Sequence, residues 1–290
     1  MSFTNGESWV VLSEIEQRIK AKIEAIGTPL KDWDINIYRG VLTGFNEAFI
    51  INGQKKDEIL ANCKDDAERI KTDELIRPIL RGRDIKRYSY EFADLYLLFI
   101  PWHFPLHYDT SIVGASEKAE KEFKKQYPAV YNHLLNYKEQ LSNRNKAETG
   151  IRYEWYALQR WGANYWEDFY KQKIAWNRIA SVKQFALIDE GIFIQDSMHF
   201  FTGNHLHYLT AILNSKLFSW LLNLIVGEAA GGNAGNSDNI RNLKIPYPNV
   251  KLEKEIIKHL NDKNYKKIDN LIFKLYQFTD FEISEIDRTF

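Results

Sequence analysis

The chain has almost no cysteine and no excess of charge of either sign. Cys63 is the single cysteine among 290 residues, which excludes an internal disulfide framework and is typical of a protein in a reducing cytoplasm. Lysine and arginine together number 39, as do aspartate and glutamate, so the formal net charge is zero. Many nucleic-acid-binding proteins are basic overall, so any such binding here must come from a local patch of charge.

The chain also lacks signals for export and for membrane insertion. Its start, MSFTNGESWVVL, has no basic stretch followed by an apolar one, so no signal peptide is predicted. The most apolar segment, residues 205–226, is interrupted by Asn214, Ser215, Lys216 and Asn223. This pattern predicts a buried helix rather than a membrane span. We therefore expect a cytoplasmic protein with no membrane partner.

Familiar catalytic and cofactor motifs are missing. The sequence contains no GxGxxG, GxxxxGK[ST], CxxC or HExxH pattern. His103 and His107 have helical spacing, but Pro105 would break the helix needed to align them. His205 and His207 begin an apolar stretch and are interpreted as structural residues. No metal site is predicted from these histidines.

One short stretch leaves open the hypothesis that the protein is a nuclease. Glu122-Phe-Lys124 matches the loose ExK element of many nucleases, and Asp109 lies upstream. Metal-dependent nucleases place such carboxylates around one ion on a sheet. Here the stretch lies within EKAEKEFKK, which instead predicts a solvated helix face.

The order of the expected elements predicts an α+β fold. We expect helices at 13–26, 55–77, 116–127, 128–141 and 205–225 and in the last forty residues, with capping boxes at Ser13/Glu16 and Thr279/Glu282. Strands are expected within 35–51 and at 95–100, 173–179, 185–189 and 191–194. Because strands and helices do not alternate regularly, mixed or antiparallel strands with inserted helices and a C-terminal helical part are favoured over a doubly wound sheet.

The segment IYRGVLTGFNEAFII, residues 37–51, has apolar runs around two glycines. A phosphate-binding loop would lead from a strand into a helix N-terminus and carry a lysine or more glycines. The segment instead predicts a hairpin of strand, turn and strand. In it Gly40 and Gly44 permit the bends, and Asn46 and Glu47 bond the turn.

Two basic stretches are candidates for DNA contact. Residues 77–90, RPILRGRDIKRYSY, carry Arg77, Arg81, Arg83, Lys86 and Arg87 against the single acid Asp84. Arginine forks match phosphate oxygens and guanine edges. The same arginines could instead pair with Asp84, with Glu91 or with the acid-rich helix expected before them, and the sequence leaves the two interpretations equal.

The second stretch, residues 155–180, mixes aromatic and basic side chains. Such mixtures stack bases and hold phosphates, although a Trp-rich core explains most of these aromatics as well. Arg160, Asn177 and Arg178 remain candidates for contact with the DNA bases. A loop at 227–239 adds Asn233, Asn236 and Asn239, whose amides suit adenine but are equally common in any loop.

Five motifs in order carry a family resemblance: YRGVLTGFNEAFI, LIRPILRGRDIKRY, WYALQR with KIAWNRI, FFTGNHLHYLTAILNSKLFSWLL, and a Gly-rich loop followed by NLKIPYP. In this order they resemble the C-terminal specificity region of the Taq-type adenine-N6 DNA methyltransferases. The likeness is greatest to the target recognition domain of Type IIG restriction–modification enzymes. It spans about Trp33 to Ile286.

The resemblance implies a division of the chain and a set of framework residues. Residues 1–34 would be a connector helix from an upstream methyltransferase, 35–250 the DNA target recognition domain with a helical insertion at about 115–145, and 251–290 the C-terminal helices. The motif correspondence covers Gly40, Thr43, Gly44, Asn46, Glu47 and Phe49, and further along Arg81, Gly82, Arg83, Asp84, Ile85, Leu213, Asn214, Ser215 and Pro246.

The resemblance also implies a function without catalysis in this part of the polypeptide. The chain would bind double-stranded DNA and position it for adenine-N6 methylation and cleavage by the methyltransferase and nuclease domains of a parent polypeptide. S-adenosylmethionine and Mg²⁺ would belong to those other domains, with no cofactor here. Candidate DNA-binding residues are Arg81, Arg83, Lys86, Arg87, Arg160, Asn177, Arg178, Asn233 and Asn236. The alternatives are an independent metal-dependent nuclease and a protein-interaction scaffold.

Overall fold

A four-stranded antiparallel sheet lies at the centre of the molecule. In the computed structural model, which describes residues 12–178, 184–228 and 236–288, its strand order is β2-β9-β6-β7. The strands are β2 (Ile35–Arg39), β6 (Lys173–Asn177), β7 (Phe185–Ile188) and β9 (Met198–Gly203). We call this the central sheet. Its register sets Arg39 of β2 and Trp176 of β6 opposite His199 of β9.

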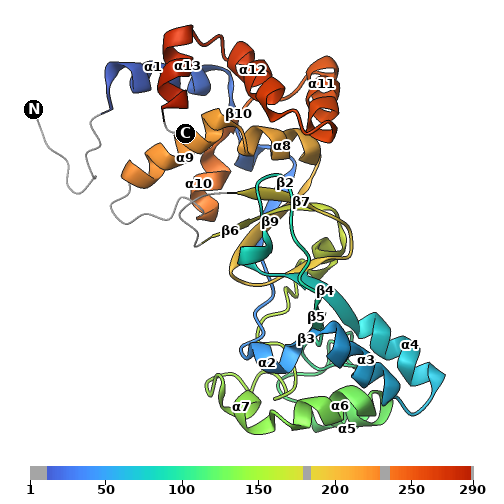
Figure 1. The fold of residues 1–290 in the computed structure, drawn as a ribbon. Helices are drawn as coiled ribbons and strands as arrows, with labels where there is room; N and C mark the ends of the chain where they lie inside the picture. The colour runs from blue at the N-terminus through green and yellow to red at the C-terminus, as the bar shows by residue number, and fades with distance from the viewer. Residues whose placement is uncertain (1–11, 179–183, 229–235, 289–290) are drawn as a thin grey trace, which may run out of the picture.

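A second four-stranded sheet, of order β3-β5-β4-β8, leads away from the central sheet (Figure 1). Its strands are β3 (Ile50–Asn52), β4 (Ile76–Leu80), β5 (Leu95–Leu98) and β8 (Phe193–Ile194). Only the pair β4–β8 is parallel among the pairings of these two sheets. A short antiparallel pair joins β1 (Thr28–Pro29) to β10 (Lys244–Ile245). The mixed sheets and interspersed helices confirm the predicted α+β class.

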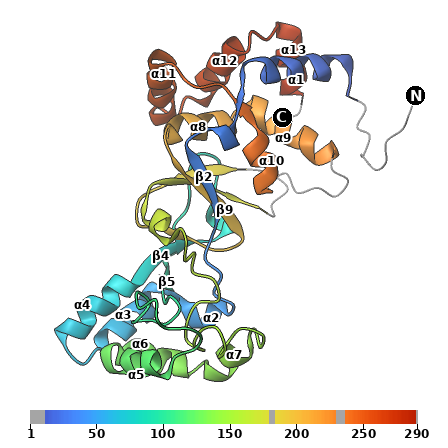
Figure 2. The same ribbon diagram turned by 180° about the vertical axis from the view of Figure 1, so that it is seen from behind.

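Helices from both ends of the chain gather beyond one side of the central sheet (Figures 1 and 2). They are α1 (Glu14–Ile26), α8 (Leu206–Leu213), α9 (Lys216–Glu228), α10 (Ser237–Asn242), α11 (Val250–Asn261), α12 (Tyr265–Leu275) and α13 (Asp280–Asp287). Both predicted capping boxes are present, at Ser13 and at Thr279. Lys22 of α1 bridges to Glu282 of α13 at 2.7 Å, which ties the first helix to the last.

A second group of helices lies at the opposite end of the molecule, around the second sheet (Figure 1). It comprises α2 (Asn46–Phe49), α3 (Gly53–Ala61), α4 (Asp66–Leu75), α5 (Glu117–Gln126), α6 (Pro128–Leu135) and α7 (Lys138–Asn143). Short 3-10 helices occur at Leu30–Asp32, Gly82–Asp84 and Trp166–Tyr170. The two ends have separate apolar clusters, and alternate residues of β9 serve both: Phe200 packs into one cluster and Phe201 into the other.

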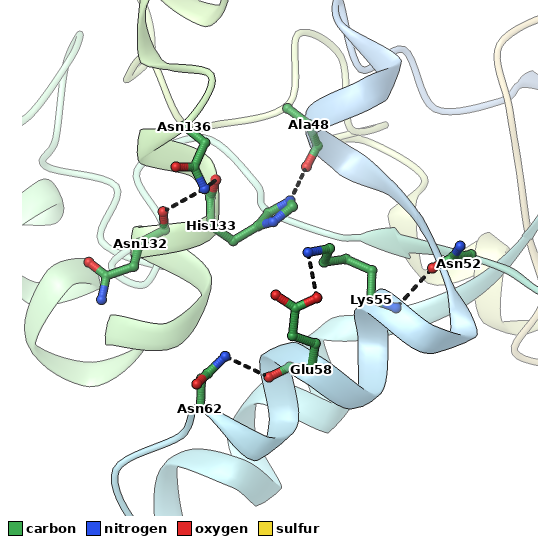
Figure 3. Close-up of polar contacts among 8 residues, drawn as sticks. All are labelled: Ala48, Asn52, Lys55, Glu58, Asn62, Asn132, His133 and Asn136. Carbon is green, nitrogen blue, oxygen red and sulfur yellow. Dashed lines mark hydrogen bonds and ion pairs between the residues drawn. The ribbon is translucent and has the colours of Figure 1, made fainter.

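The prediction of a hairpin at residues 37–51 is wrong. β2 ends at Arg39 and β3 begins at Ile50, and the two strands belong to different sheets with α2 between them. The tertiary context decides this, because His133 of α6 places Nε2 3.0 Å from the carbonyl oxygen of Ala48 and so holds α2 against α6 (Figure 3). The helix α3 begins directly after β3, because the Asn52 side chain accepts a hydrogen bond from the Lys55 amide and caps α3 (Figure 3).

Two long predicted helices are each divided. The 55–77 segment forms α3 and α4, and Pro78 lies inside β4 rather than ending a helix. The 205–225 segment breaks at Asn214, whose amide exchanges two hydrogen bonds with the backbone of Phe185 in β7. Through this pairing the break anchors α8 to the edge of the central sheet. No helix in the described part of the chain is long and apolar enough to cross a membrane.

Candidate nucleic-acid interface

Arg81, in the basic stretch 77–90, is turned toward an acid of its own turn. Its Nε and Nη2 donate to the two carboxylate oxygens of Asp84 at 3.0 and 2.8 Å, and its backbone amide donates to the same group at 2.8 Å. The Asp84 side chain is only 6% exposed. Burial alone would raise the pKa of this carboxyl, but the hydrogen bonds from Arg81 and the charges of Arg81 and Arg83 hold it below its usual value.

Arg87 and Lys86 also have partners within the protein. Arg87 donates from Nε and Nη2 to the carbonyl oxygen of Asn214, at 3.0 and 2.6 Å, and satisfies that carbonyl at the end of α8. Lys86 lies 3.3 Å from the carboxylate of Glu91. The alternative of internal pairing is therefore realised for Arg81, Lys86 and Arg87, and their role in DNA binding stays a prediction.

Arg83 differs from its neighbours. Its side chain is exposed and, within the described part of the chain, has no hydrogen bond or ion pair. The preceding Gly82 packs against Asn177 at the end of β6 so closely that a Cβ atom would clash with the Asn177 amide. This close approach packs the turn that carries Arg83 against Asn177 and so joins two separate candidate stretches of the sequence.

Two further arginines lie on this part of the central sheet. Arg39 ends β2 opposite His199, and Arg241 of α10 reaches the carbonyl oxygen of Ile37 at 3.5 Å. Arg178 is nearby, because its amide donates to the Ser197 carbonyl at the start of β9. These residues gather at one end of the central sheet, with Asn177 on the side opposite Arg39, and we define the basic face as Arg39, Arg83, Asn177, Arg178 and Arg241. Sequence reasoning missed both residues, because Arg39 lies in the motif YRGVLTGFNEAFI, which was interpreted as framework, and no motif contains Arg241.

Three arginines of the basic face act on His199. Burial lowers the pKa of His199, a hydrogen bond to the Tyr38 backbone opposes this in part, and the charges of Arg178, Arg39 and Arg241 each lower it by a smaller amount. The Arg39 guanidinium bonds to Asp196 at 3.0 Å, yet its side chain remains 45% exposed. Three arginines thus converge around one neutral histidine and favour an anion at this surface.

The remaining predicted DNA-binding residues lie in different positions. Arg160 is exposed, and its backbone pairs with Leu42, just beyond the end of β2. Asn236 is the N-cap of α10 and accepts from the Asp238 amide at 3.3 Å. Asn233 lies outside the described residues. Asn236 is therefore engaged in holding the helix that carries Arg241.

The motif residues between β2 and β3 form a framework. Thr43 donates to the side chain of Asn46 at 2.7 Å, and Gly44 adopts a left-handed conformation with φ of 76°. Phe49 is fully buried in the apolar cluster that also contains Phe200. Gly40 passes so close to the Gln195 carbonyl that a Cβ atom has no room. Glu47 is exposed, and its side chain has no hydrogen bond within residues 12–178, 184–228 and 236–288.

The carboxylates of the nuclease alternative do not converge. Glu122 lies on α5 and accepts a hydrogen bond from Gln126, whereas Asp109 lies in a loop and accepts from Ser111. Among the residues that the structure describes, no group of three or more histidine, cysteine, aspartate or glutamate side chains has the geometry to hold a metal ion.

Comparison with known proteins defines the class of this chain. Residues 77–232 match the model of the TaqI-like C-terminal specificity domain, which is more than half of the chain. The chain therefore belongs to the TaqI-like C-terminal specificity domain family. It is 26% identical over 249 residues to the Type II methyltransferase M.MjaIV of Methanocaldococcus jannaschii, a match covering 80% of this chain and 73% of the relative.

A solved structure shows the same fold. The type IIG restriction endonuclease BpuSI matches with a TM-score of 0.55 at 15% identity, over 95% of this chain and 32% of its own length. The type IIL restriction–modification enzyme MmeI, solved in complex with DNA, matches with a TM-score of 0.48 at 12% identity, over 89% of this chain and 35% of its own. The chain thus spans about a third of the length of these two enzymes.

Proposed function

We propose that this chain is the DNA-recognition module of a Type IIG restriction–modification enzyme. It would hold duplex DNA so that other domains of the parent polypeptide methylate adenine at N6 and cleave the DNA. Membership of the specificity-domain family and the fold shared with a type IIG endonuclease support this assignment. The relative M.MjaIV is named a Type II methyltransferase, which supports the link to methylation.

The observation that carries the proposal is the basic face. Its arginines come from four separate segments, at residues 39, 83, 178 and 241, and three of them lie close enough to His199 to shift its pKa together. A zero net charge gives the whole chain no general attraction for DNA. A concentrated cluster supplies that attraction locally, because phosphate contacts dominate affinity for duplex DNA.

Within the basic face, we assign different roles to its members. Arg83 and Asn177 have side chains of the kinds that bond guanine and adenine edges bidentately in the major groove. Arg39 and Arg241 have guanidinium groups already oriented by Asp196 and by the Ile37 carbonyl. Fixed donors of this kind suit phosphate oxygens, which set the register of a protein on DNA.

The proposal predicts strongly salt-dependent binding to duplex DNA. Each phosphate that the protein neutralises should add about −0.9 to the slope of log K against log salt concentration. Titration of a labelled duplex at several salt concentrations measures this slope. Affinity indistinguishable from that of a neutral control protein at low salt would contradict the proposed function.

The parent enzyme would supply the chemistry. We expect its methyltransferase and nuclease domains to use S-adenosylmethionine and Mg²⁺, and we expect it to act on the cell's own DNA in the cytoplasm. Expression of the full parent and mapping of methylated adenines in the host genome would give the recognised sequence. Substitution of Asn177 or Arg83 should then relax that sequence at one position, at a cost of about 1–3 kcal/mol.

A further inference from the structure

A cavity of about 230 Å³ lies beside α4, and none of its lining residues belongs to the basic face. Its walls come from α4, from β4, from the segment after β5 and from the 3-10 helix Trp166–Tyr170. Most of the wall residues are aromatic, among them Phe99, Trp161, Trp166 and Tyr170. These rings come from parts of the chain far apart in sequence, so the fold itself assembles the cavity.

Two residues that line the cavity carry a buried polar atom without a hydrogen bond in the described part of the chain. Nε of Arg77 and Nδ1 of His107 are buried, and neither has a hydrogen-bond partner among the described residues. Both residues line the cavity. Because Nε is fully buried, a ligand in the cavity would meet the outer nitrogens of the Arg77 guanidinium.

The charges at the cavity favour an anion. Arg77 and Lys71 line it together with a single acid, Glu74. The Arg77 guanidinium carbon lies 5.2 Å from the centre of the Tyr170 ring, which fixes the plane of the fork. Aromatic cages for cationic ligands contain no such fixed cation. Burial lowers the pKa of His107 against a smaller effect of the Pro105 backbone, so the imidazole is neutral at pH 7 and adds no charge.

We propose that this cavity binds a nucleotide, with the base among the aromatic side chains and the phosphate on Arg77. Bases stack on aromatic side chains with little dependence on base identity, and a guanidinium fork matches phosphate oxygens. The cavity is smaller than the roughly 300–1,000 Å³ typical of drug-sized ligands. It therefore accommodates one base, with the phosphate at its mouth. The nucleotide is either a free mononucleotide or an unpaired nucleotide within a DNA strand.

Calorimetric titration of the full chain with the four deoxynucleoside monophosphates and with the matching nucleosides tests the proposal. We expect saturable binding of at least one monophosphate, and about tenfold weaker binding of its nucleoside, because the phosphate contact is lost. Quenching of tryptophan fluorescence provides a second readout, since Trp161 and Trp166 line the cavity. Absence of saturable binding of all four monophosphates at roughly 10 mM, a concentration far above the Kd of a specific site, would overturn the proposal.

Variants locate the site. Arg77→Lys keeps the charge but removes the fork, and Trp166→Leu removes one stacking surface from a half-buried position. Each should weaken monophosphate binding about tenfold, whereas Arg69→Lys, at an exposed position of α4 outside the cavity, should leave it unchanged. Equal binding by wild type, Arg77→Lys and Trp166→Leu would overturn the proposal, provided that thermal melting shows all three folded.

A second arm separates the two sources of the nucleotide and is independent of the proposed DNA-recognition function. A duplex with one extrahelical nucleotide is compared with the fully paired duplex. Tighter binding of the former by about tenfold, lost in Trp166→Leu, identifies a nucleotide of a DNA strand. Equal binding of the two duplexes, together with binding of the monophosphate, identifies a free nucleotide. Both results can be interpreted even if the basic face does not bind paired DNA.

Discussion

Arg81 and the arginines of the basic face have different partners, although Arg81 and Arg83 belong to the same turn, residues 81–84. In the turn, Arg81 is bonded to Asp84, whose side chain is only 6% exposed. On the basic face, Arg39 keeps a 45% exposed side chain, and Arg83 and Arg241 are exposed. The comparison teaches that the density of arginine in a sequence does not locate a binding surface. Burial and the available partners decide which guanidinium groups can meet a ligand.

The substitution with the largest expected effect tests this comparison at Arg81. Arg81→Ala leaves the Asp84 carboxylate buried without its counter-ion, so the free energy of unfolding should fall by about 3–5 kcal/mol. Urea denaturation measures the loss. Arg83→Ala, two residues away, is the matched variant, and its free energy of unfolding should stay within about 0.5 kcal/mol of wild type. Equal stability of the two variants would contradict the structural role of Arg81.

The next effect concerns the segment that connects β2 of the central sheet to β3 of the second sheet. Gly40→Ala would place a methyl group against the carbonyl oxygen of Gln195, which belongs to the backbone and cannot turn aside. The free energy of unfolding should fall by about 1–3 kcal/mol, as for other overpacked sites. Thermal melting or urea denaturation checks this. A variant as stable as wild type would show that the segment after β2 moves freely.

A smaller effect follows from three histidines whose pKa values lie below the usual value, chiefly because of burial: His107, His133 and His199. Between each lowered pKa and the unfolded value of about 6.5, the unfolded chain binds more protons than the folded protein. The free energy of unfolding should therefore decline as pH falls below about 6.5. Denaturation at pH 7.5 and 5.5 measures the decline.

His199→Gln sharpens this result because it removes the histidine that faces the arginines. The variant should lose less stability between pH 7.5 and 5.5 than wild type does. An identical pH profile would mean that His199 titrates alike in the folded and unfolded chain, and that Arg39, Arg178 and Arg241 do not act on it together.

Local chemistry explains which parts of the fold were predictable from sequence. The capping boxes at Ser13 and Thr279 depend on residues three apart, and both were predicted correctly. The hairpin at 37–51 was wrong because distant contacts, from Gln195 to Gly40 and from His133 to Ala48, determine the path of that segment. No local pattern contains those contacts.

The candidate site follows the same rule. Arg83, Asn177 and Arg178 were identified from their own stretches, but their proximity depends on the packing of Gly82 against β6. Arg241 reaches the carbonyl of Ile37, 204 residues away in sequence, so no motif could reveal it as part of the site. In the cavity, likewise, Arg77 and Trp166 belong to two stretches that seemed separate in the sequence.

The most direct test of the central claim is the salt dependence of duplex DNA binding in the double variant Arg83→Ala/Arg241→Ala. If the basic face holds the DNA backbone, the slope of log K against log salt should fall in magnitude by about 2 relative to wild type, about 1 for each contact removed. Arg69→Ala, an exposed arginine on α4, should keep the wild-type slope. A double variant with the wild-type slope and affinity would contradict the claim that this face binds DNA.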